Sequence, residues 1–268
     1  MTLPSAPCVL ALVLTTVLAN KVSGKITGGS DARLREFPYS VSLRTYDFEG
    51  LGHFCGGAIV SPSLVITAGA CTDPASPKID EIVAGTLNRV IAYPGQQVRK
   101  PRTIVPHPGY TFPPYNDISL IFLDEPFVFH ENISAVALPE VNQTTYPNPV
   151  VVNGWGAEQY GLPMSEVLQR VTLDTYSDEY CAEFMNAEVP PSLLCAGTNE
   201  GGIGACIGDA GAPVTATTDK VYLAGVLSHF GCTDSQCCGF PGPMNHNPEV
   251  VHYLEWILQQ NRIHNGGL

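Results

Sequence analysis

Basic residues are scarce in this sequence. Lys and Arg number 13 against 25 Asp and Glu, which gives the 268-residue chain a formal net charge of -12. Nucleic acids and anionic membrane surfaces are bound through clustered Lys and Arg, so this balance argues against both kinds of partner. Charged residues of either sign make up only 14% of the chain, and hydrophobic residues make up 44%. This composition favours a globular protein with a large core over a disordered one.

Long hydrophobic runs are also missing after residue 25. No later stretch approaches the roughly 20 apolar residues of a membrane-spanning helix, so we expect a soluble mature chain with no membrane span. The run from Cys8 to Ala19 is too short for such a span and is followed by polar Asn20 and Lys21. It therefore predicts a secretory signal peptide over residues 1–19, cleaved between residues 19 and 24, although no Lys or Arg precedes it.

The cysteine content favours an oxidising compartment. Nine cysteines minus Cys8 of the leader leave eight, an even number that suits disulfide bonds in a secreted, extracellular protein. Two sequons, Asn132-Ile133-Ser134 and Asn142-Gln143-Thr144, predict N-glycosylation at Asn132 and Asn142.

Short apolar or alternating segments separated by Gly, Pro and Asn predict an all-β barrel or sandwich. They include Val41–Leu43, Gly57–Thr67, Ile118–Leu123, Val150–Val152 and Val221–Ser228. A helix is expected only at the end of the chain, where apolar residues recur at helical spacing; these are Val250, Val251, Leu254, Ile257 and Leu258. No repeat or linker divides the chain after residue 25, which predicts a single domain.

Six motifs occur in an order that resembles the chymotrypsin and trypsin family of serine proteases. They are Lys25-Ile26-Thr27-Gly28-Gly29, His53-Phe54-Cys55-Gly56-Gly57, Thr67-Ala68-Gly69-Ala70-Cys71, Tyr115-Asn116-Asp117-Ile118, Asn153-Gly154-Trp155-Gly156 and Gly208-Asp209-Ala210-Gly211-Ala212-Pro213. The resemblance implies two six-stranded antiparallel β-barrels with the site between them and a C-terminal α-helix. It also implies a pro-segment at residues 20–25 and a protease-like domain over residues 26–268.

The sequence departs from the family at the positions that carry its chemistry. The resemblance calls for His at position 70 and Ser at position 210, and both hold alanine, while Asp117 remains. A methyl group neither accepts nor releases a proton, so we predict that the chain is not an enzyme but an inactive homologue. The backbone N–H groups of Gly208 and Ala210 would form a remnant of the oxyanion hole.

Other readings stay open. In a rewired, weakly active serine-type endopeptidase, the candidate bases are His53, His107 and His229, and the candidate nucleophiles are Ser228 and Thr67. In our main interpretation the chain binds an extracellular protein, such as a protease, a substrate or an inhibitor, as a cofactor, decoy or regulator of proteolysis. A third possibility is a secreted carrier or structural protein. We predict no cofactor and no metal.

The resemblance also assigns disulfide, pocket and activation residues. It pairs Cys55 with Cys71, Cys181 with Cys195 and Cys206 with Cys232. Cys237 and Cys238 then remain, and they would bond to each other, exchange with Cys232 for Cys206, or link two chains. Gly204, Ser228, His229 and Phe230 are implied as the remnant of the specificity pocket, with no charge at Gly204 to pair a substrate Lys or Arg. Cleavage after Lys25 would free an amino terminus at Ile26 to pair with Asp209.

Overall fold

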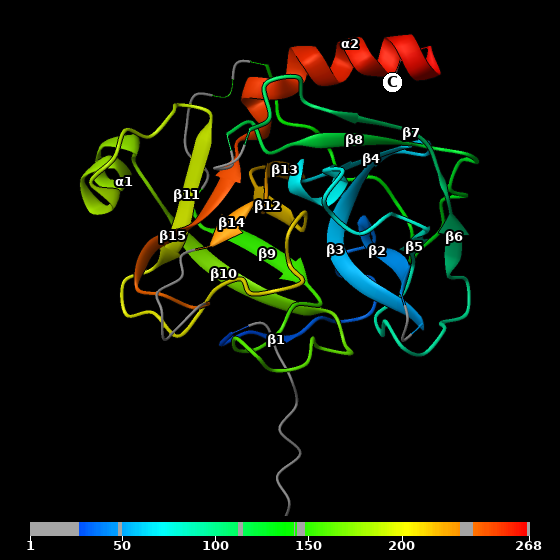
Figure 1. Ribbon diagram of the computed structural model, residues 1–268, viewed down its shortest axis with the longest axis horizontal. Coiled ribbons are helices and arrows are strands. Elements are labelled where there is room, and N and C mark those ends of the chain that lie inside the picture. Colours follow the sequence, from blue (N-terminus) through cyan, green and yellow to red (C-terminus); the bar gives the residue numbers. More distant parts are fainter. Residues whose placement is uncertain are drawn as a thin grey trace, which may run out of the picture.

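The computed structural model describes residues 27–47, 50–111, 115–141, 143, 148–230 and 238–266. Two curled antiparallel sheets lie side by side, and a helix closes the chain (Figure 1), which confirms the predicted fold class. The number of strands differs from the expected six in each sheet. The described residues form a seven-stranded first sheet and an eight-stranded second sheet, because short pairings add to the edges.

The first sheet is built from the N-terminal half of the chain. Its strand order is β6-β5-β2-β3-β4-β8-β7. The strands are β2 (Ser40–Asp47), β3 (Gly50–Ser61), β4 (Leu64–Thr67), β5 (Glu81–Ala84), β6 (Gln97–Arg99), β7 (Pro101–Pro106) and β8 (Ser119–Leu123). Every residue of β4 and β8 is buried. These continuous β-branched and apolar segments therefore form the centre of the first core.

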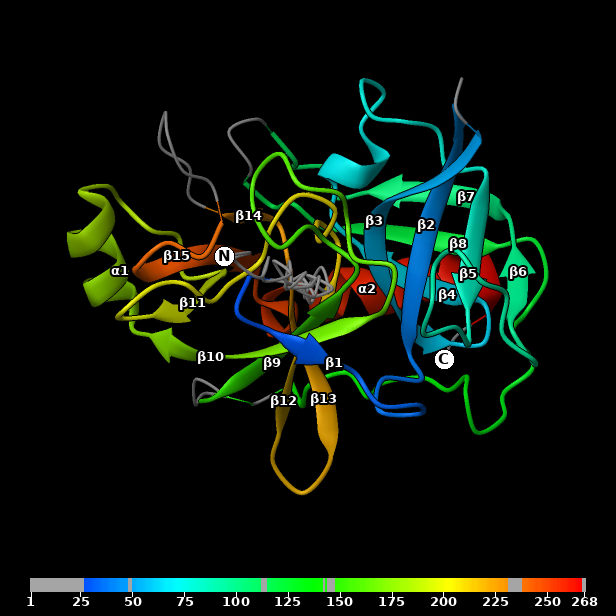
Figure 2. The same ribbon diagram turned by 90° about the horizontal axis from the view of Figure 1, so that it is seen from below.

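The second sheet follows in the C-terminal half. Its order is β13-β12-β9-β10-β11-β15-β14, and β1 pairs with β10. The strands are β1 (Ser30–Asp31), β9 (Val150–Gly154), β10 (Gln169–Tyr176), β11 (Leu193–Thr198), β12 (Pro213–Thr217), β13 (Val221–Val226), β14 (His229–Phe230) and β15 (Gly242–Pro248). The hairpin of β12 and β13 extends away from the rest of the molecule (Figure 2).

The expected C-terminal helix is present, and it belongs to the core of the first sheet. A short 3₁₀ turn (Val250–Tyr253) leads into α2 (Leu254–Asn265), which ends at Gly266 with a φ of 78°. Leu254 and Ile257 are buried in the same apolar cluster as the strands of the first sheet. The helix thus connects the end of the second sheet to the first one.

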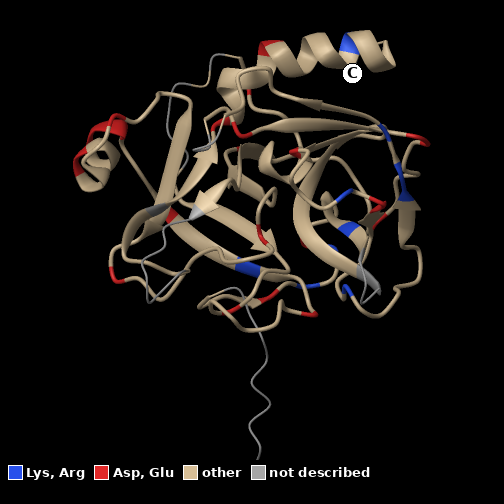
Figure 3. Cartoon of the chain, viewed as in Figure 1, with Lys and Arg blue, Asp and Glu red and all other residues tan. Residues whose placement is uncertain are grey.

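A second helix, α1 (Asp178–Met185), was not predicted from the sequence. It begins at Ser177, whose hydroxyl accepts a hydrogen bond from the Tyr180 N–H at 3.3 Å, as an N-cap does. The helix is only eight residues long, so its apolar periodicity gives a weak signal. Its charged side chains are all acidic (Figure 3). None of the helices in the described ranges is long and apolar enough to span a membrane.

Candidate active site

Asp117 lies two residues before β8, in a turn that contacts with other elements hold in place. Asn116, the residue before it, has a φ of 51°, in the left-handed region that few side chains adopt. The Asn116 amide donates a hydrogen bond to the Gly109 carbonyl at 2.9 Å and accepts one from the Tyr253 hydroxyl at 3.1 Å. These contacts set the direction in which the Asp117 side chain leaves the backbone.

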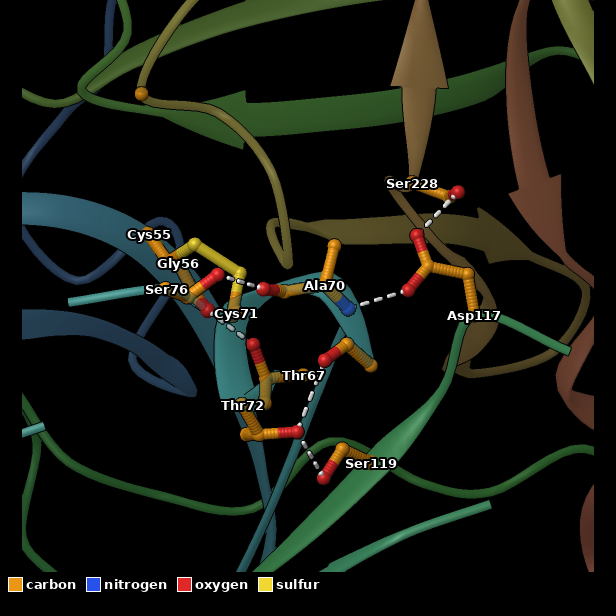
Figure 4. The surroundings of a disulfide bond; sticks show 12 residues. Cys55, Gly56, Thr67, Ala70, Cys71, Thr72, Ser76, Asp117, Ser119 and Ser228 are labelled. Atoms are coloured by element: carbon orange, nitrogen blue, oxygen red, sulfur yellow. Dashed lines mark hydrogen bonds between the residues drawn. A yellow bond between two sulfur atoms is a disulfide. The ribbon is translucent and has the colours of Figure 1, made fainter. Parts of the chain in front are cut away.

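The carboxylate of Asp117 accepts hydrogen bonds on both oxygens (Figure 4). The backbone N–H of Ala70 donates to Oδ1 at 2.6 Å, and the Ser228 hydroxyl donates to Oδ2 at 2.5 Å. Burial raises the pKa of Asp117, and the bonds from Ser228 and Ala70 partly oppose that rise. The pKa of Asp117 therefore lies above its ordinary value, which makes this carboxylate a better proton acceptor than an exposed one.

Ala70 begins the 3₁₀ turn (Ala70–Thr72) that follows β4, and several contacts fix this turn. Its carbonyl accepts a hydrogen bond from the Ser76 hydroxyl at 2.5 Å, and the next residue, Cys71, is bonded to Cys55 of β3. The Thr72 hydroxyl contacts Ser119 of β8 at 2.9 Å. The structure thus places the position expected to hold the catalytic base beside Asp117, where a half-buried methyl group stands.

The loop that carries Gly208, Asp209 and Ala210 is tied to both sheets. The Ala210 carbonyl accepts a hydrogen bond from the Gly56 N–H of β3 at 2.7 Å, and the Gly211 N–H donates to the Leu227 carbonyl at 2.7 Å. Gly211 has a φ of 78°, and a Cβ there would lie 2.2 Å from the Thr67 hydroxyl oxygen. Among the described residues, no protein acceptor is bonded to the N–H of Gly208 or Ala210. Gly208 is buried and Ala210 is half-buried.

Asp209 is fully buried beneath this loop. Its carboxylate accepts hydrogen bonds from the N–H groups of Gly156 at 2.8 Å and Cys206 at 3.0 Å. Burial raises the pKa of Asp209 to about 7 despite these two bonds. Lys25 and Ile26 lie outside the described residues, while Thr27 is paired with Gly204 nearby.

His53 and Thr67, both considered for a rewired site, serve the structure instead. The His53 ring contacts the Ser42 hydroxyl through Nδ1 and the Gly208 carbonyl through Nε2, each at 2.9 Å. Desolvation lowers the pKa of His53 to about 3, so the ring is neutral and supports the loop. The Thr67 hydroxyl is buried and donates to the Gly56 carbonyl at 2.8 Å.

The other two histidines differ from each other in their environment. The ring of His107 packs edge-on against Tyr253 and Trp256, with ring centroids 5.3 and 4.9 Å apart. His229 is exposed, and desolvation lowers its pKa because it outweighs the opposing effect of the Asp117 charge. Of the predicted bases and nucleophiles, the structure therefore brings only Ser228 and His229 to Asp117.

Gly204, where the resemblance places the floor of the specificity pocket, has a neighbour that the sequence did not single out. Asn245 of β15 is buried, and its side chain accepts a hydrogen bond from the Ala205 N–H at 3.0 Å and donates one to the Ala196 carbonyl at 3.2 Å. A Cβ at Gly204 would lie 3.4 Å from the Asn245 amide nitrogen. The expected pocket floor therefore carries no charge at Gly204 and has this amide beside it. The backbone of Phe230 pairs with Asn245, and its side chain lies outside the described residues.

A cavity of about 250 Å³ lies next to this site. Its walls come from the segment after α1, from β14 and β15, and from the turn before β8. The lining is mainly apolar and includes His229 and His246. Desolvation lowers the pKa of His246 to about 4, so this ring is neutral.

One predicted disulfide pairing needs correction. Cys55 is bonded to Cys71 and Cys181 to Cys195, as predicted, but Cys206 is bonded to Cys238 instead of Cys232, which is one of the alternatives that the sequence left open. Cys232, Cys237 and Cys238 are close together in the sequence. Which of them bonds to Cys206 depends on the path of the chain, and spacing in the sequence does not define that path. Cys232 and Cys237 lie outside the described residues, as does the predicted glycosylation site Asn142. The side chain of Asn132 accepts a hydrogen bond from Arg35 at 3.3 Å, and its glycosylation stays a prediction.

Comparisons with known proteins agree with this geometry. Residues 26–257 match the sequence model of the family described as Trypsin. The chain is 37% identical to trypsin-1 of Astacus astacus over 239 residues, which cover 87% of this chain and 98% of that protein. It is 32% identical to the vitellin-degrading protease of Bombyx mori, covering 87% and 84%. It is 30% identical to serine proteinase stubble of Drosophila melanogaster, covering 89% of this chain and 31% of that protein.

These relatives contradict the prediction that the chain is not an enzyme. Proteins named as a trypsin and as proteases match it over most of its length. The prediction rested on two side chains, Ala70 and Ala210, and took their methyl groups as sufficient evidence against any activity. That inference was wrong. The loss of one proton acceptor and one nucleophile lowers the rate of the family's usual mechanism, but it does not exclude catalysis by other groups in the cleft.

Proposed function

Because this chain belongs to the trypsin family of serine proteases, we propose that it is a serine-type endopeptidase of low turnover that acts on extracellular polypeptides. The observation that carries the proposal is the hydrogen bond from the Ser228 hydroxyl to the buried carboxylate of Asp117. A hydroxyl beside a carboxylate with a raised pKa is a nucleophile next to a base. The secreted location is part of this proposal and is supported by the disulfide bonds.

The chemistry follows from these two side chains. The Asp117 carboxylate takes the proton of the Ser228 hydroxyl as Oγ bonds to the acyl carbon of the scissile peptide. The same proton passes to the leaving amine as the carbon–nitrogen bond breaks. Water then hydrolyses the acyl ester on Ser228 and regenerates the hydroxyl. The N–H groups of Gly208 and Ala210 are the candidate donors for the developing oxyanion.

The expected rate is low because no imidazole shuttles the proton. In subtilisin, loss of the triad's His or Ser costs about 2 × 10⁶ in kcat, or roughly 8–9 kcal/mol of barrier. About 10³–10⁴ over the uncatalysed rate remains there, from the oxyanion hole and substrate binding. We expect this chain to work in that range.

The pocket floor favours small, uncharged side chains before the scissile bond. Gly204 carries no charge, and the amide of Asn245 occupies space beside it. A substrate Lys or Arg would bury its charge without a partner, which is costly. Peptides with Ala, Gly or Ser at that position are therefore the proposed substrates.

Hydrolysis of fluorogenic peptides by the purified protein tests the proposal. We expect the wild type to cleave peptides with a small residue before the scissile bond about 10³-fold faster than the uncatalysed reaction. Ser228→Ala and Asp117→Asn should each lower the rate several-fold, toward the part that the oxyanion hole and substrate binding supply by themselves. The double variant Ala70→His with Ala210→Ser should raise it by about 10³-fold or more, because it restores the family's base and nucleophile.

Two outcomes would contradict the proposal. Equal rates for the wild type and Ser228→Ala, both purified in the same way and equally stable to heat, would remove the role of Ser228. A wild type that does not exceed the uncatalysed rate, beside a restored variant that does, would remove the endopeptidase function itself. A fluorophosphonate probe that labels Ser228, located by mass spectrometry, would support the nucleophile directly.

Cleavage after Lys25 is a further part of the proposal. Thr27 already lies in place, since it pairs with Gly204 and its hydroxyl donates to the Glu158 carbonyl at 2.5 Å. A new ammonium group at Ile26 would need to reach the carboxylate of Asp209. Such an ion pair would lower the free-energy cost of burying the Asp209 carboxylate without an opposite charge beside it. N-terminal sequencing of the secreted protein would show whether the mature chain begins at Ile26.

A further inference from the structure

Three aromatic rings form a stacked row along one side of α1. The centroids of Tyr176 and Tyr180 are 5.2 Å apart with an interplanar angle of 15°. Those of Tyr180 and Phe184 are 6.5 Å apart with an angle of 24°. Tyr180 and Phe184 are four residues apart on α1, so their side chains lie one above the other, while Tyr176 is the last residue of β10, just before the helix. We call Tyr176, Tyr180 and Phe184 the α1 aromatic face.

This face is open to solvent. Tyr180 is 45% exposed and Phe184 is 46% exposed, although each carries a large apolar surface. Helix α1 lies at the far end of the second sheet, away from the first sheet (Figure 1). Exposed aromatic rings in a contiguous row mark interaction surfaces more often than they mark ordinary surface.

Acidic residues lie beside the α1 aromatic face. Asp174 is two residues before Tyr176 on β10, so the two side chains leave the same face of that strand. The Tyr176 hydroxyl donates a hydrogen bond to the Asn199 side chain at 2.9 Å, and Glu200 is the next residue in the chain. Burial raises the pKa of Tyr176, and the charges of Asp174 and Glu200 raise it further. Glu183 is exposed on α1 itself. Among the described residues, none of these three carboxylates forms a salt bridge.

Basic residues are absent from the sequence that forms this region. The chain contains no Lys or Arg between Arg170 and Lys220. The face therefore combines aromatic rings with carboxylates that form no salt bridge within the described part of the chain. A guanidinium group fits both features, because it stacks on aromatic rings and pairs with carboxylates in the same plane.

We propose that the α1 aromatic face binds an arginine-containing basic segment of a partner polypeptide. The Arg side chains would lie against Tyr180 and Phe184 and pair with Glu183 and Glu200. This surface is separate from Asp117 and Ser228, so the proposal does not depend on the catalytic role of those residues. It gives the chain a means of holding a protein by a site other than the cleft.

Fluorescence anisotropy with a labelled twelve-residue peptide of alternating Arg and Gly tests the binding. The protein carries Ser228→Ala, so peptide cleavage does not interfere. We expect saturable binding of this peptide and at least 10-fold weaker binding of the same peptide with Glu in place of Arg. Affinity should fall as salt rises from about 50 to 300 mM, because exposed charges are screened.

Substitutions in the α1 aromatic face test whether the Arg peptide binds there. Tyr180→Ser and Phe184→Ser, each alone, should weaken binding at least 5-fold, and Glu183→Gln with Glu200→Gln should weaken it about 3-fold and flatten the salt dependence. The matched control is Glu125→Gln with Glu140→Gln, which removes the same charge from exposed positions elsewhere. This control should change the affinity less than 2-fold.

The proposal is overturned if the Arg and Glu peptides bind equally, or if the control weakens binding as much as the α1 variants do. Self-association of the protein that both Tyr180→Ser and Phe184→Ser abolish, with no binding of the Arg peptide, would identify a second copy of the chain as the occupant instead. A thermal melting temperature within about 3 °C of the parent for each variant ensures that a loss of binding is not a loss of fold.

Discussion

At the scale of single residues, Asp209 shows how burial alone sets the behaviour of a charge. Its carboxylate is fully buried and has two backbone N–H donors, Gly156 and Cys206, yet its pKa is raised to about 7. The cost of desolvation therefore exceeds the stabilisation by the two hydrogen bonds. Gly154 and Gly156 have no room for a side chain, since a Cβ at either one would lie within about 2.2 Å of this carboxylate.

A pH series on Asp209→Asn tests this assignment. The folded pKa of about 7 lies above the unfolded value, so the folded state binds more protons in between, and stability falls as pH rises from about 4 to 7. Asp209→Asn should remove that slope. The measurement is urea unfolding of both proteins in the Lys25→Gln background, which blocks cleavage there. Parallel pH profiles for the two proteins would show that Asp209 titrates normally.

At the scale of elements, the bridge between Cys206 and Cys238 ties the loop of Asp209 to the segment before β15. Cys206 also donates its backbone N–H to Asp209. The two cysteines are 32 residues apart in the sequence. The bond therefore restricts a long segment of the unfolded chain, and the resulting loss of conformational entropy in the unfolded state stabilises the fold. Asn245, beside the expected pocket floor at Gly204, lies on the strand that follows.

Peptide mapping without reduction should recover Cys206 joined to Cys238. Cys238→Ser should lower the free energy of unfolding by about 2–5 kcal/mol, whereas Cys232→Ser should leave the mapped bridge intact and lower it less. A fragment that joins Cys206 to Cys232 in the wild type would contradict the pairing found here.

At the scale of the whole molecule, α2 holds the two halves of the chain together. It follows β15 of the second sheet, yet Leu254 and Ile257 are buried in the core of the first sheet. The Arg102 side chain of β7 donates hydrogen bonds to the His264 carbonyl at 3.1 Å and to the Asn265 side chain at 2.9 Å. The arrangement of the sheets around the site therefore depends on the last helix.

Ile257→Ala should destabilise the protein by about 2–5 kcal/mol, because it opens a cavity at a fully buried position. Ile263→Ala is the matched control on the same helix, since Ile263 is 64% exposed, and it should change stability by no more than about 0.5 kcal/mol. Thermal or urea unfolding measures both. Similar losses for the two variants would mean that α2 does not pack as described.

The sequence predicted those parts of the fold and site that depend on local pattern. Buried strands such as β8 appear in the sequence as continuous apolar segments, and α2 was predicted from apolar residues at helical spacing. Asp117 and Ala70 were identified because each lies inside a motif whose order along the chain is informative. The short helix α1 escaped because eight residues offer too few turns for periodicity to show.

The amino-acid sequence by itself determined the β architecture, the order of the motifs and the identity of the side chains at positions 70, 117 and 210. Only the tertiary structure decided that Ser228 is hydrogen-bonded to Asp117, that Asn245 is hydrogen-bonded to Ala205 beside Gly204 and that Cys206 pairs with Cys238. The physical reason is distance along the chain. Each of these contacts joins residues at least 32 positions apart, and their meeting depends on how two sheets curl, which no local pattern specifies.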